Sequence, residues 1–335
     1  MHVLITGGAG FIGSHVVERM LEHGHGVCVL DDLSSGLRAN LPHGVDFHHA
    51  SICDPQALRA AVEGVDAIVH LAAIASVTRS VQEPSVTHEV NLTSTVRLAE
   101  AAARAGVGKL VYASSAAVYG FAEREAHHED DPVAPVTPYA IDKLTGETYL
   151  GFFTSEHGLD TRSLRFFNVY GPRQQPSSPY AGVIARFATG LLAGEPLTVY
   201  GDGHQTRDFI YVGDVARIVA RHVEEQIVPG SAQIMNVCNG TRTTLHDLID
   251  ALAAACGVAG PAASGEPGQF DAYPTAAGEP AAAAAGVEVR HEAARSGDIR
   301  HSRGSPARLG QWFPGRPRTS LARGLERVIA WMGEG

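Results

Sequence analysis

Gly7-Gly8-Ala9-Gly10-Phe11-Ile12-Gly13 decides the fold, because its glycines have the spacing of a turn between a strand and a helix. An apolar run over residues 3–6 precedes the turn, and apolar side chains recur at helical spacing from Val16 to Leu21. Glycines at such a turn let the backbone approach a pyrophosphate, whose charge is favoured by the free amides at the helix start. The sequence therefore predicts a dinucleotide site at this turn.

The same alternation continues along the first half of the chain. Strands are predicted over residues 3–6, 27–30, 67–73 and 109–115, with amphipathic helical segments between them. This rhythm predicts an α/β fold with a Rossmann-type, doubly wound parallel sheet and a smaller C-terminal α/β domain.

Gly171-Pro172 is the predicted point where the chain leaves the first domain. We expect residues 1–172 to form the nucleotide domain, with a segment near 205–240 returning to it, and residues 173–335 to form mainly the substrate domain. Residues 259–286 are rich in Ala, Gly and Pro and are expected to be a loop-like insertion.

Composition excludes several classes of protein. The 335 residues are 44% hydrophobic and 19% charged, which is typical of a globular enzyme. A formal net charge of −10 disfavours general binding to nucleic acid, because a phosphate backbone requires a basic surface. The sequence has no signal-peptide pattern and no long apolar stretch, so we expect a cytoplasmic protein that does not enter a membrane.

The cysteines and histidines predict no metal site. Four scattered cysteines include no Cys-x-x-Cys pair and have no histidine nearby at metal-ligand spacing, which indicates free thiols. The pairs His48-His49 and His127-His128 lack the spacing that places two rings on one face, and we expect them at the solvated surface.

Asp31 narrows the choice of dinucleotide. It ends the second predicted strand, about 20 residues beyond the glycine turn, where a carboxylate can hydrogen-bond the adenosine ribose. Such a carboxylate disfavours a 2′-phosphate, so NAD is favoured over NADP, although Ser34 and Ser35 nearby leave NADP open.

Tyr139 and Lys143 lie four residues apart, which on a helix places both side chains on one face. An ammonium beside a phenol, together with a cationic nicotinamide, is expected to lower the phenol's pKa and make it a base near neutrality. Ser114-Ser115 ends a predicted strand, so the Ser115 hydroxyl can hydrogen-bond the reacting oxygen. These residue types in this order predict the catalytic set Ser115, Tyr139 and Lys143.

Together these motifs resemble the extended short-chain dehydrogenase/reductase family, in its NAD-dependent nucleotide-sugar epimerase and dehydratase branch. The resemblance covers nearly the whole chain and is closest to UDP-sugar 4-epimerases. It is carried by Thr6 to Gly13, Asp31-Asp32-Leu33, His70-Leu71-Ala72-Ala73, Asn91, Ser114 to Gly120, Tyr139 with Lys143, Arg165 to Arg173, Tyr200 to Val215 and Arg295-Ser296-Gly297-Asp298.

The resemblance implies which residues contact the ligands. Those implied to contact NAD are Gly7, Gly10, Phe11, Ile12, Gly13, Asp31, Asp32, Ser35, Ile52, Leu71, Ala72, Ala73, Asn91, Tyr139, Lys143 and Phe166. Those implied to contact a UDP-sugar are Ser115, Tyr139, Asn168, Gly182, Val183, Arg186, Tyr200, Gln205, Arg207, Arg295 and Asp298. Ser51 departs from the family, which often has an adenine-binding Asp at that position.

The resemblance also implies the reaction. Dehydratases of this family carry an Asp-Glu pair, and decarboxylases a Glu, before Val-Tyr-Gly, where this chain has Ala116 and Ala117. Without those acids the expected outcome is 4-epimerisation through a transient 4-keto sugar, with a dehydratase, a decarboxylase and a non-catalytic NAD-sensing module as alternatives.

The substrate stays open among UDP-glucuronate, UDP-glucose and UDP-N-acetylglucosamine. Arg186 matches an arginine that binds the carboxylate in UDP-glucuronate 4-epimerases, and Ser302 replaces a bulky aromatic of hexose-specific enzymes. These two residues favour UDP-glucuronate. The family resemblance further implies a homodimer.

Overall fold

The computed structural model describes residues 1–121, 124–175, 182–257, 288–294, 299–316 and 318–333. Within these ranges no helix has the length and apolarity needed to cross a membrane. The insertion predicted over residues 259–286 lies outside the described residues, as do Arg295 and Asp298.

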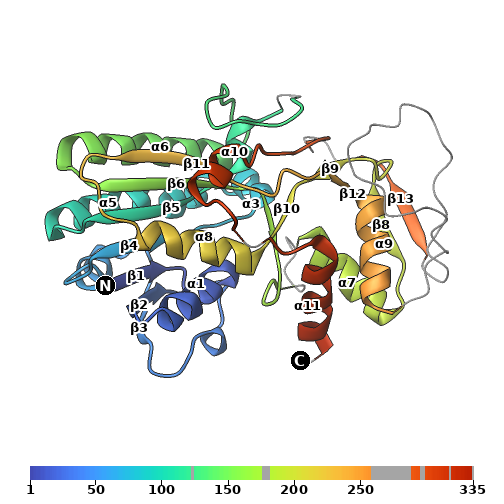
Figure 1. Cartoon of the computed structure of the whole chain (residues 1–335), viewed down its shortest axis with the longest axis horizontal. Helices are drawn as coiled ribbons and strands as arrows, with labels where there is room; N and C mark the ends of the chain where they lie inside the picture. The colour runs from blue at the N-terminus through green and yellow to red at the C-terminus, as the bar shows by residue number, and fades with distance from the viewer. Residues whose placement is uncertain (122–123, 176–181, 258–287, 295–298, 317, 334–335) are drawn as a thin grey trace.

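A seven-stranded sheet forms the larger part of the molecule (Figure 1). Its strand order is β11-β6-β5-β4-β1-β2-β3, and each neighbouring pair is parallel. The strands are β1 (His2–Thr6), β2 (Gly26–Asp31), β3 (Asp46–His49), β4 (Ala67–His70), β5 (Lys109–Ser115), β6 (Asp160–Phe166) and β11 (Ala232–Val237). This arrangement confirms the predicted Rossmann-type fold.

Helices cover both faces of the sheet (Figure 1). On one face, Val3, Ile5 and Val29 pack in a core with side chains of α1 (Phe11–Glu22) and α8 (Val212–Glu224). On the other face, the alternate strand residues pack with α2 (Pro55–Ala61), α5 (Ser94–Ala105) and α6 (Pro138–His157). Because both faces of the sheet are covered, the central strands β1, β2 and β4 are nearly continuous apolar runs.

The short elements of this larger part occupy its loops. They are η1 (Arg38–Asn40), α3 (Val77–Gln82), α4 (Pro84–His88), η2 (Glu89–Thr93) and η3 (Ala116–Tyr119). The last of these begins directly after β5, at the edge of the sheet where its strands end.

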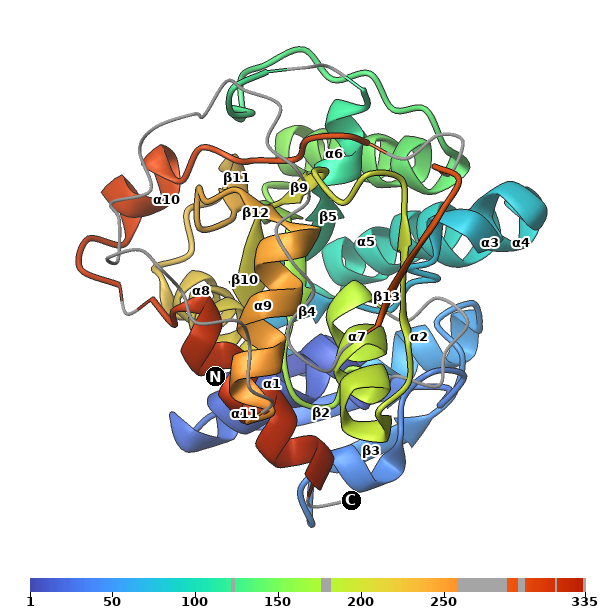
Figure 2. The ribbon, with the colours of Figure 1, turned by 90° about the vertical axis from the view of Figure 1, so that its right-hand side faces the viewer.

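A smaller unit with its own apolar core lies beside the sheet edge, and Figure 2 views the molecule from its side. Helix α9 packs there against both α7 and α11. The elements outside the large sheet in this half of the chain are β7 (Asn168–Tyr170), α7 (Val183–Ala193), β8 (Leu197–Tyr200), β9 (Thr206–Arg207), β10 (Phe209–Tyr211), β12 (Thr243–Thr244), α9 (Leu245–Ala255), β13 (Val289–Glu292), α10 (Ala307–Trp312) and α11 (Leu321–Gly333). Between them, α8 and β11 return to the large sheet.

Two local expectations are corrected. The strand predicted over residues 67–73 ends at His70, because the Ala72 amide donates to the Thr6 hydroxyl and Ile74 is held by Asn91. His127 is buried rather than solvated, since its ring stacks on Tyr119 with centroids 4.5 Å apart.

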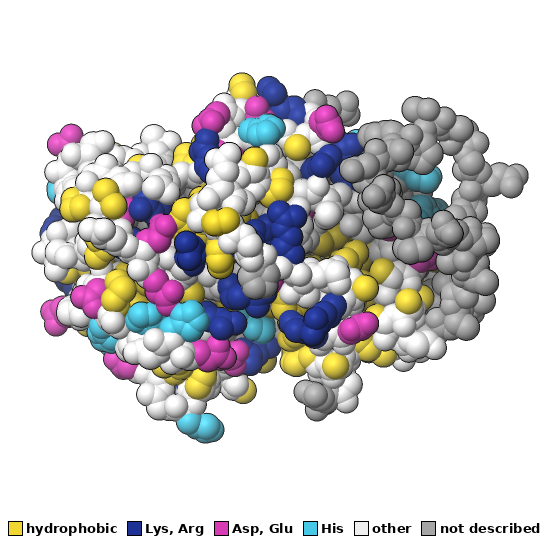
Figure 3. All heavy atoms as spheres, viewed as in Figure 1, with side chains coloured by type: hydrophobic (Ala, Val, Ile, Leu, Met, Phe, Trp, Pro, Cys, Tyr) yellow, Lys and Arg dark blue, Asp and Glu magenta, His cyan; other side chains and the backbone are white. Residues whose placement is uncertain are grey.

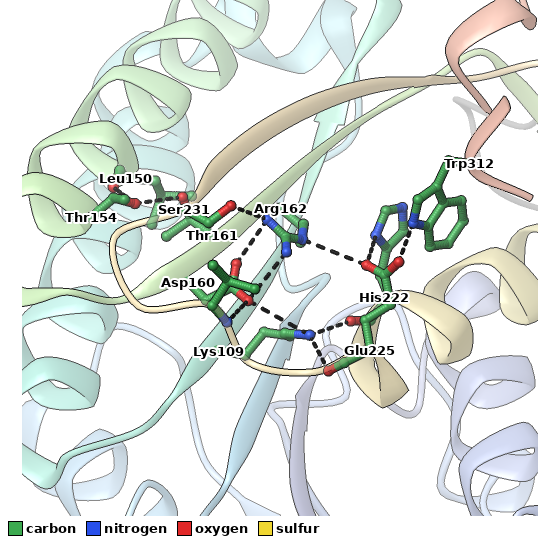
Figure 4. A network of polar contacts seen from close by, with 11 residues as sticks. Lys109, Leu150, Thr154, Asp160, Thr161, Arg162, His222, Glu225, Ser231 and Trp312 are labelled. Carbon is green, nitrogen blue, oxygen red and sulfur yellow. Dashed lines mark hydrogen bonds and ion pairs between the residues drawn. The ribbon is translucent and has the colours of Figure 1, made fainter.

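A buried polar network lies at the opposite end of the strands, where β5 and β6 begin (Figure 4). Lys109 Nζ donates to the backbone oxygens of His222 and Glu225 at 2.9 and 2.6 Å, and Arg162 pairs with Asp160 at 2.8 Å. These interactions attach α8 and the segment after it to the central strands.

Acidic and basic side chains are interspersed on the molecular face drawn in Figure 3.

Candidate active site

The glycine turn has the geometry that a bound pyrophosphate requires. Gly7 has φ +71°, and a Cβ on Gly13 would lie 2.1 Å from the Gly7 oxygen. Helix α1 then starts after Gly10, with no side-chain cap and no acidic residue in its first turn. The first amides of α1 therefore remain available for an anion, which fits the diphosphate of NAD.

Asp31 lies against this turn at the end of β2. Its carboxylate accepts hydrogen bonds from the backbone amides of Ala9 at 2.9 Å and Leu33 at 2.8 Å. Burial raises its pKa, while these two hydrogen bonds act in the opposite direction. Asp31 thus fixes the glycine turn to the loop after β2 and places a carboxylate at the predicted ribose site.

A second loop, after β4, lies beside the glycine turn. Asn91 accepts from the Ile74 amide at 2.8 Å and donates to the Ile74 oxygen at 3.0 Å. Buried His70 bridges Thr6 and Thr95, and desolvation lowers its pKa to about 3. The neutral imidazole therefore holds the end of β4 to the end of β1. Leu71 and Ala72 follow His70 directly, in the loop beside the glycine turn.

The three predicted catalytic residues meet where β5 ends. Ser115 caps η3 by accepting from the Ala117 amide at 3.2 Å, and it also hydrogen-bonds Tyr139. Lys143 Nζ lies 5.9 Å from the Tyr139 ring centroid and donates to the Ala113 oxygen at 2.7 Å. The hydroxyl, the phenol and the ammonium are therefore held together by β5 and one face of α6.

The surroundings of Tyr139 in the protein itself oppose ionisation of its phenol. Burial raises the pKa of Tyr139, and the hydrogen bond with Ser115 only partly opposes that effect. The Lys143 ammonium, 5.9 Å from the Tyr139 ring centroid, donates its hydrogen bond to the Ala113 oxygen. Burial also lowers the pKa of Lys143 to about 8, against the nearby charges of Asp142 and Glu147.

Behind this set lies an ion pair that the sequence analysis missed. Arg165 donates to both oxygens of Glu147, at 3.0 and 2.8 Å, and Ser114 donates to the same carboxylate. Arg165 also donates to the Tyr119 hydroxyl at 3.0 Å. The only sequence signal was that Glu147 continues the four-residue spacing of Tyr139 and Lys143 along α6.

Several residues predicted to bind the sugar nucleotide are joined in the smaller unit. The Arg186 guanidinium lies 5.9 Å from the centroid of the Tyr200 ring, and the Gln205 side chain donates to the backbone oxygen of Tyr200 at 2.6 Å. Gly182 is the N-cap of α7, and a Cβ there would lie 2.8 Å from Gln174. One wall thus carries a guanidinium, an aromatic ring and an amide.

The remaining sugar-nucleotide residues lie on neighbouring short strands. Asn168 begins β7, and its backbone amide donates to the backbone oxygen of Asp208 at 3.0 Å, next to Arg207 of β9. Asp208 accepts from the amides of Asn239 and Gly240, and burial raises its pKa to about 6. Asp208 therefore links the start of β7 to the loop at Asn239 and Gly240, next to Arg207.

The other predicted cofactor and substrate contacts are distributed as follows. Asp32 and Ser35 are exposed in the loop after β2, and Ile52 is buried after β3. Partly buried positions are Phe11, Ile12, Ala73, Phe166 and Val183. Phe166 is the register partner of Ser115 across β5 and β6, so it lies at the same edge of the sheet.

Comparison with known proteins agrees with this geometry. Residues 3–238 match the model of the NAD dependent epimerase/dehydratase family. The chain belongs to this family. A UDP-glucose 4-epimerase of Mycolicibacterium smegmatis is 38% identical over 98% of this chain and 97% of its own length. NAD is therefore the cofactor of this chain.

Two solved structures are similar over the whole chain. The UDP-glucose 4-epimerase of Thermus thermophilus in complex with NAD has a TM-score of 0.85 and 36% identity, and the coverage is 100% of both chains. MoeE5 in complex with UDP-glucuronic acid and NAD has a TM-score of 0.82 and 29% identity, and the coverage is 100% of this chain and 99% of that one. These likenesses support an epimerase of the UDP-sugar class.

Proposed function

We propose that this family member catalyses 4-epimerisation of a UDP-sugar, with Ser115, Tyr139 and Lys143 as its catalytic residues. The hydroxyl of Ser115 would hold the O4 oxygen of the sugar, and the Tyr139 oxygen would receive the O4 proton. The chemistry that NAD supplies when bound is reversible acceptance of a hydride at C4. Lys143 would carry the positive charge that favours the phenolate.

The single observation that carries this proposal is the composition of η3. Ser115 is followed there by Ala116 and Ala117, so neither position offers a carboxyl group that could protonate a leaving hydroxyl or assist decarboxylation. A 4-keto sugar formed at this site would then take back a hydride and a proton. Reduction on the opposite face gives the C4 epimer.

We further propose UDP-glucuronate as the substrate. Arg186 lies in the first turn of α7 with its guanidinium near the Tyr200 ring, and a guanidinium can bind both oxygens of a carboxylate. A 4-keto uronate is a β-keto acid and loses carbon dioxide readily. Holding its carboxylate with Arg186, in the absence of an acid at Ala117, would protect the intermediate. MoeE5 is solved with UDP-glucuronic acid and also with UDP-glucose, so its structures are compatible with either sugar.

UDP-glucose is the second candidate. It is favoured by the 38% identity to the Mycolicibacterium smegmatis UDP-glucose 4-epimerase, which extends over nearly the whole of both chains. The two candidates differ only at C6 of the sugar, so the Arg186 region discriminates between them.

Separate incubations with UDP-glucuronate, UDP-glucose and UDP-N-acetylglucosamine, followed by chromatography, test both levels of the proposal. A C4 epimer from any of the three supports epimerisation, whereas a 4-keto-6-deoxy product or released carbon dioxide would refute it. Tyr139→Phe should remove the activity. A Tyr139→Phe variant that retains the protein's cellular effect would favour a non-catalytic NAD-sensing module.

Arg186→Ala tests the uronate reading. We expect kcat/KM for UDP-glucuronate to fall about 10- to 100-fold, the loss of one or two hydrogen bonds to a charged group, with little change for UDP-glucose. Arg327→Ala is the matched control, because this arginine of α11 also lies near a tyrosine ring, 5.2 Å from the centroid of Tyr211. Equal losses on all sugars would refute a carboxylate role for Arg186.

We also propose that two copies pair through the outer face of α3 and α6. Ile141, Tyr149 and Phe152 are exposed on α6, and Val77 and Val81 are exposed on the adjoining α3. Residues spaced by 8 and 11 share one face of a helix, so the three α6 side chains form an apolar stripe suited to a second copy.

Light scattering after gel filtration tests the dimer. Phe152→Asp should convert a dimer to a monomer, while Leu192→Asp, at an exposed apolar residue of α7, should leave the dimer unchanged. A monomeric wild-type protein would refute this pairing.

A further inference from the structure

Three potential metal ligands meet on strands β2 and β3, away from the glycine turn and the catalytic residues. Cys28 is the register partner of Asp46, and His48 is opposite Leu30 two positions further along. Side chains two residues apart on a strand point to the same face, so all three project from one face of the sheet. The thiol, carboxylate and imidazole ligand atoms lie within 4.8 Å of one another.

The distance between the His48 and Asp46 side chains already fits one small cation. The His48 Nε2 atom lies 3.7 Å from an Asp46 oxygen. Ligand atoms in a tetrahedral zinc site lie about 3.3–3.7 Å apart, given bonds of about 2.0–2.3 Å to nitrogen, oxygen and sulfur. Rotamer adjustments of roughly 1 Å at the other pairs would close the geometry.

The environment leaves one coordination position open. Cys28 is buried at the base of the cluster, whereas the Asp46 side chain is 64% exposed and the His48 side chain 33% exposed. Strand β3 is the edge of the sheet, so water can reach the outer side of the cluster. Three protein ligands with one water is a common zinc coordination.

We propose that Cys28, Asp46 and His48 bind one Zn²⁺ ion, with water as the fourth ligand. The mixed sulfur, nitrogen and oxygen donor set favours zinc over calcium or magnesium, which prefer oxygen alone. The ion cross-links the edge strand β3 to β2. Because Asp31 ends β2 three residues after Cys28, the ion also stabilises the strand that carries the predicted ribose-binding carboxylate.

No metal site could be predicted from the sequence, because these ligands are not neighbours in the chain. Cys28 and His48 are 20 residues apart, and only the parallel register of β2 and β3 places them together. This proposal concerns metal binding alone, so it can fail without affecting the proposed reaction.

Titration of tag-free, metal-stripped protein with Zn²⁺, followed by calorimetry, tests the site. We expect one equivalent to bind, and Co²⁺ in its place to give a thiolate-to-cobalt charge-transfer band. Cys28→Ser and His48→Gln should each raise the Kd at least about tenfold. Loss of a residue that only supports a metal ligand already costs about that much, so loss of a ligand itself should cost no less. Zinc should also raise the melting temperature of the wild type and leave that of both variants unchanged.

Matched controls lie next to these positions. His49→Gln alters the neighbouring histidine, which lies with Phe47 on the other face of β3 and stacks on its ring. Cys53→Ser alters another free cysteine. Both controls should bind Zn²⁺ as the wild type does. Absence of binding by the wild type, or equal losses in His48→Gln and His49→Gln, would overturn the proposal.

Discussion

Replacement of Glu147 by Gln should strongly destabilise the protein. The Glu147 side chain is 3% exposed and accepts two hydrogen bonds from Arg165 and one from Ser114. A glutamine keeps one acceptor oxygen, but its amide group would face the guanidinium donor to donor. Arg165, itself 3% exposed, would then be a buried charge without its counter-ion.

The size of the effect follows from these contacts. Removing one partner of a buried ion pair costs about 3–5 kcal/mol, and the surviving acceptor of glutamine places the expected loss near the lower value, about 3 kcal/mol. Burial lowers the pKa of Arg165, but the hydrogen bonds and charge of Glu147 outweigh that effect and raise it above its ordinary value. The guanidinium stays charged with or without Glu147, so the carboxylate serves to compensate that buried charge.

Urea unfolding followed by circular dichroism measures this loss. Glu100→Gln is the control, because Glu100 pairs with Arg104 at 3.7 Å on the exposed face of α5 and should change stability by at most about 0.5 kcal/mol. The double variant Glu147→Gln with Arg165→Met should lose less than the sum of the two single variants, because it leaves no unpaired charge. A Glu147→Gln protein as stable as the Glu100→Gln control would refute this reasoning.

Two further predictions concern the cofactor site. Gly13→Ala should abolish NAD binding in a fluorescence titration, because its Cβ would overlap the Gly7 oxygen. The control Gly151→Ala has no atom within 4 Å of its Cβ and should bind NAD normally. Equal affinities of the two variants would contradict the close approach at Gly13. In NAD-free protein, burial lowers the pKa of Lys143 from 10.5 to about 8. Between pH 8 and pH 10.5 the unfolded chain therefore binds more protons at this residue than the folded chain does, and the free energy of unfolding rises with pH. Lys143→Met should flatten this rise in urea titrations at several pH values, and an unchanged slope would contradict the assignment.

The sequence predicted those features that depend on local spacing. The glycine turn, the alternation of strands and helices and the shared face of Tyr139 and Lys143 each lie within a few residues, so periodicity and backbone geometry are sufficient to identify them. His70 was not identified as buried, because its neutral ring depends on Thr6 and Thr95 from two other elements. A histidine in a strand has no local signal for such partners.

Strand register determines what the sequence could not provide. Ser114 and Arg165 are register partners on β5 and β6, and this pairing brings both to the Glu147 carboxylate although they are 51 positions apart in the chain. The same limit explains Lys143: helical spacing places its ammonium beside Tyr139, but the end of β5 supplies the Ala113 oxygen that binds it. Lowering the pKa of Tyr139 therefore requires positive charge beyond what Lys143 provides in this arrangement, and the cationic nicotinamide expected beside the phenol would supply it.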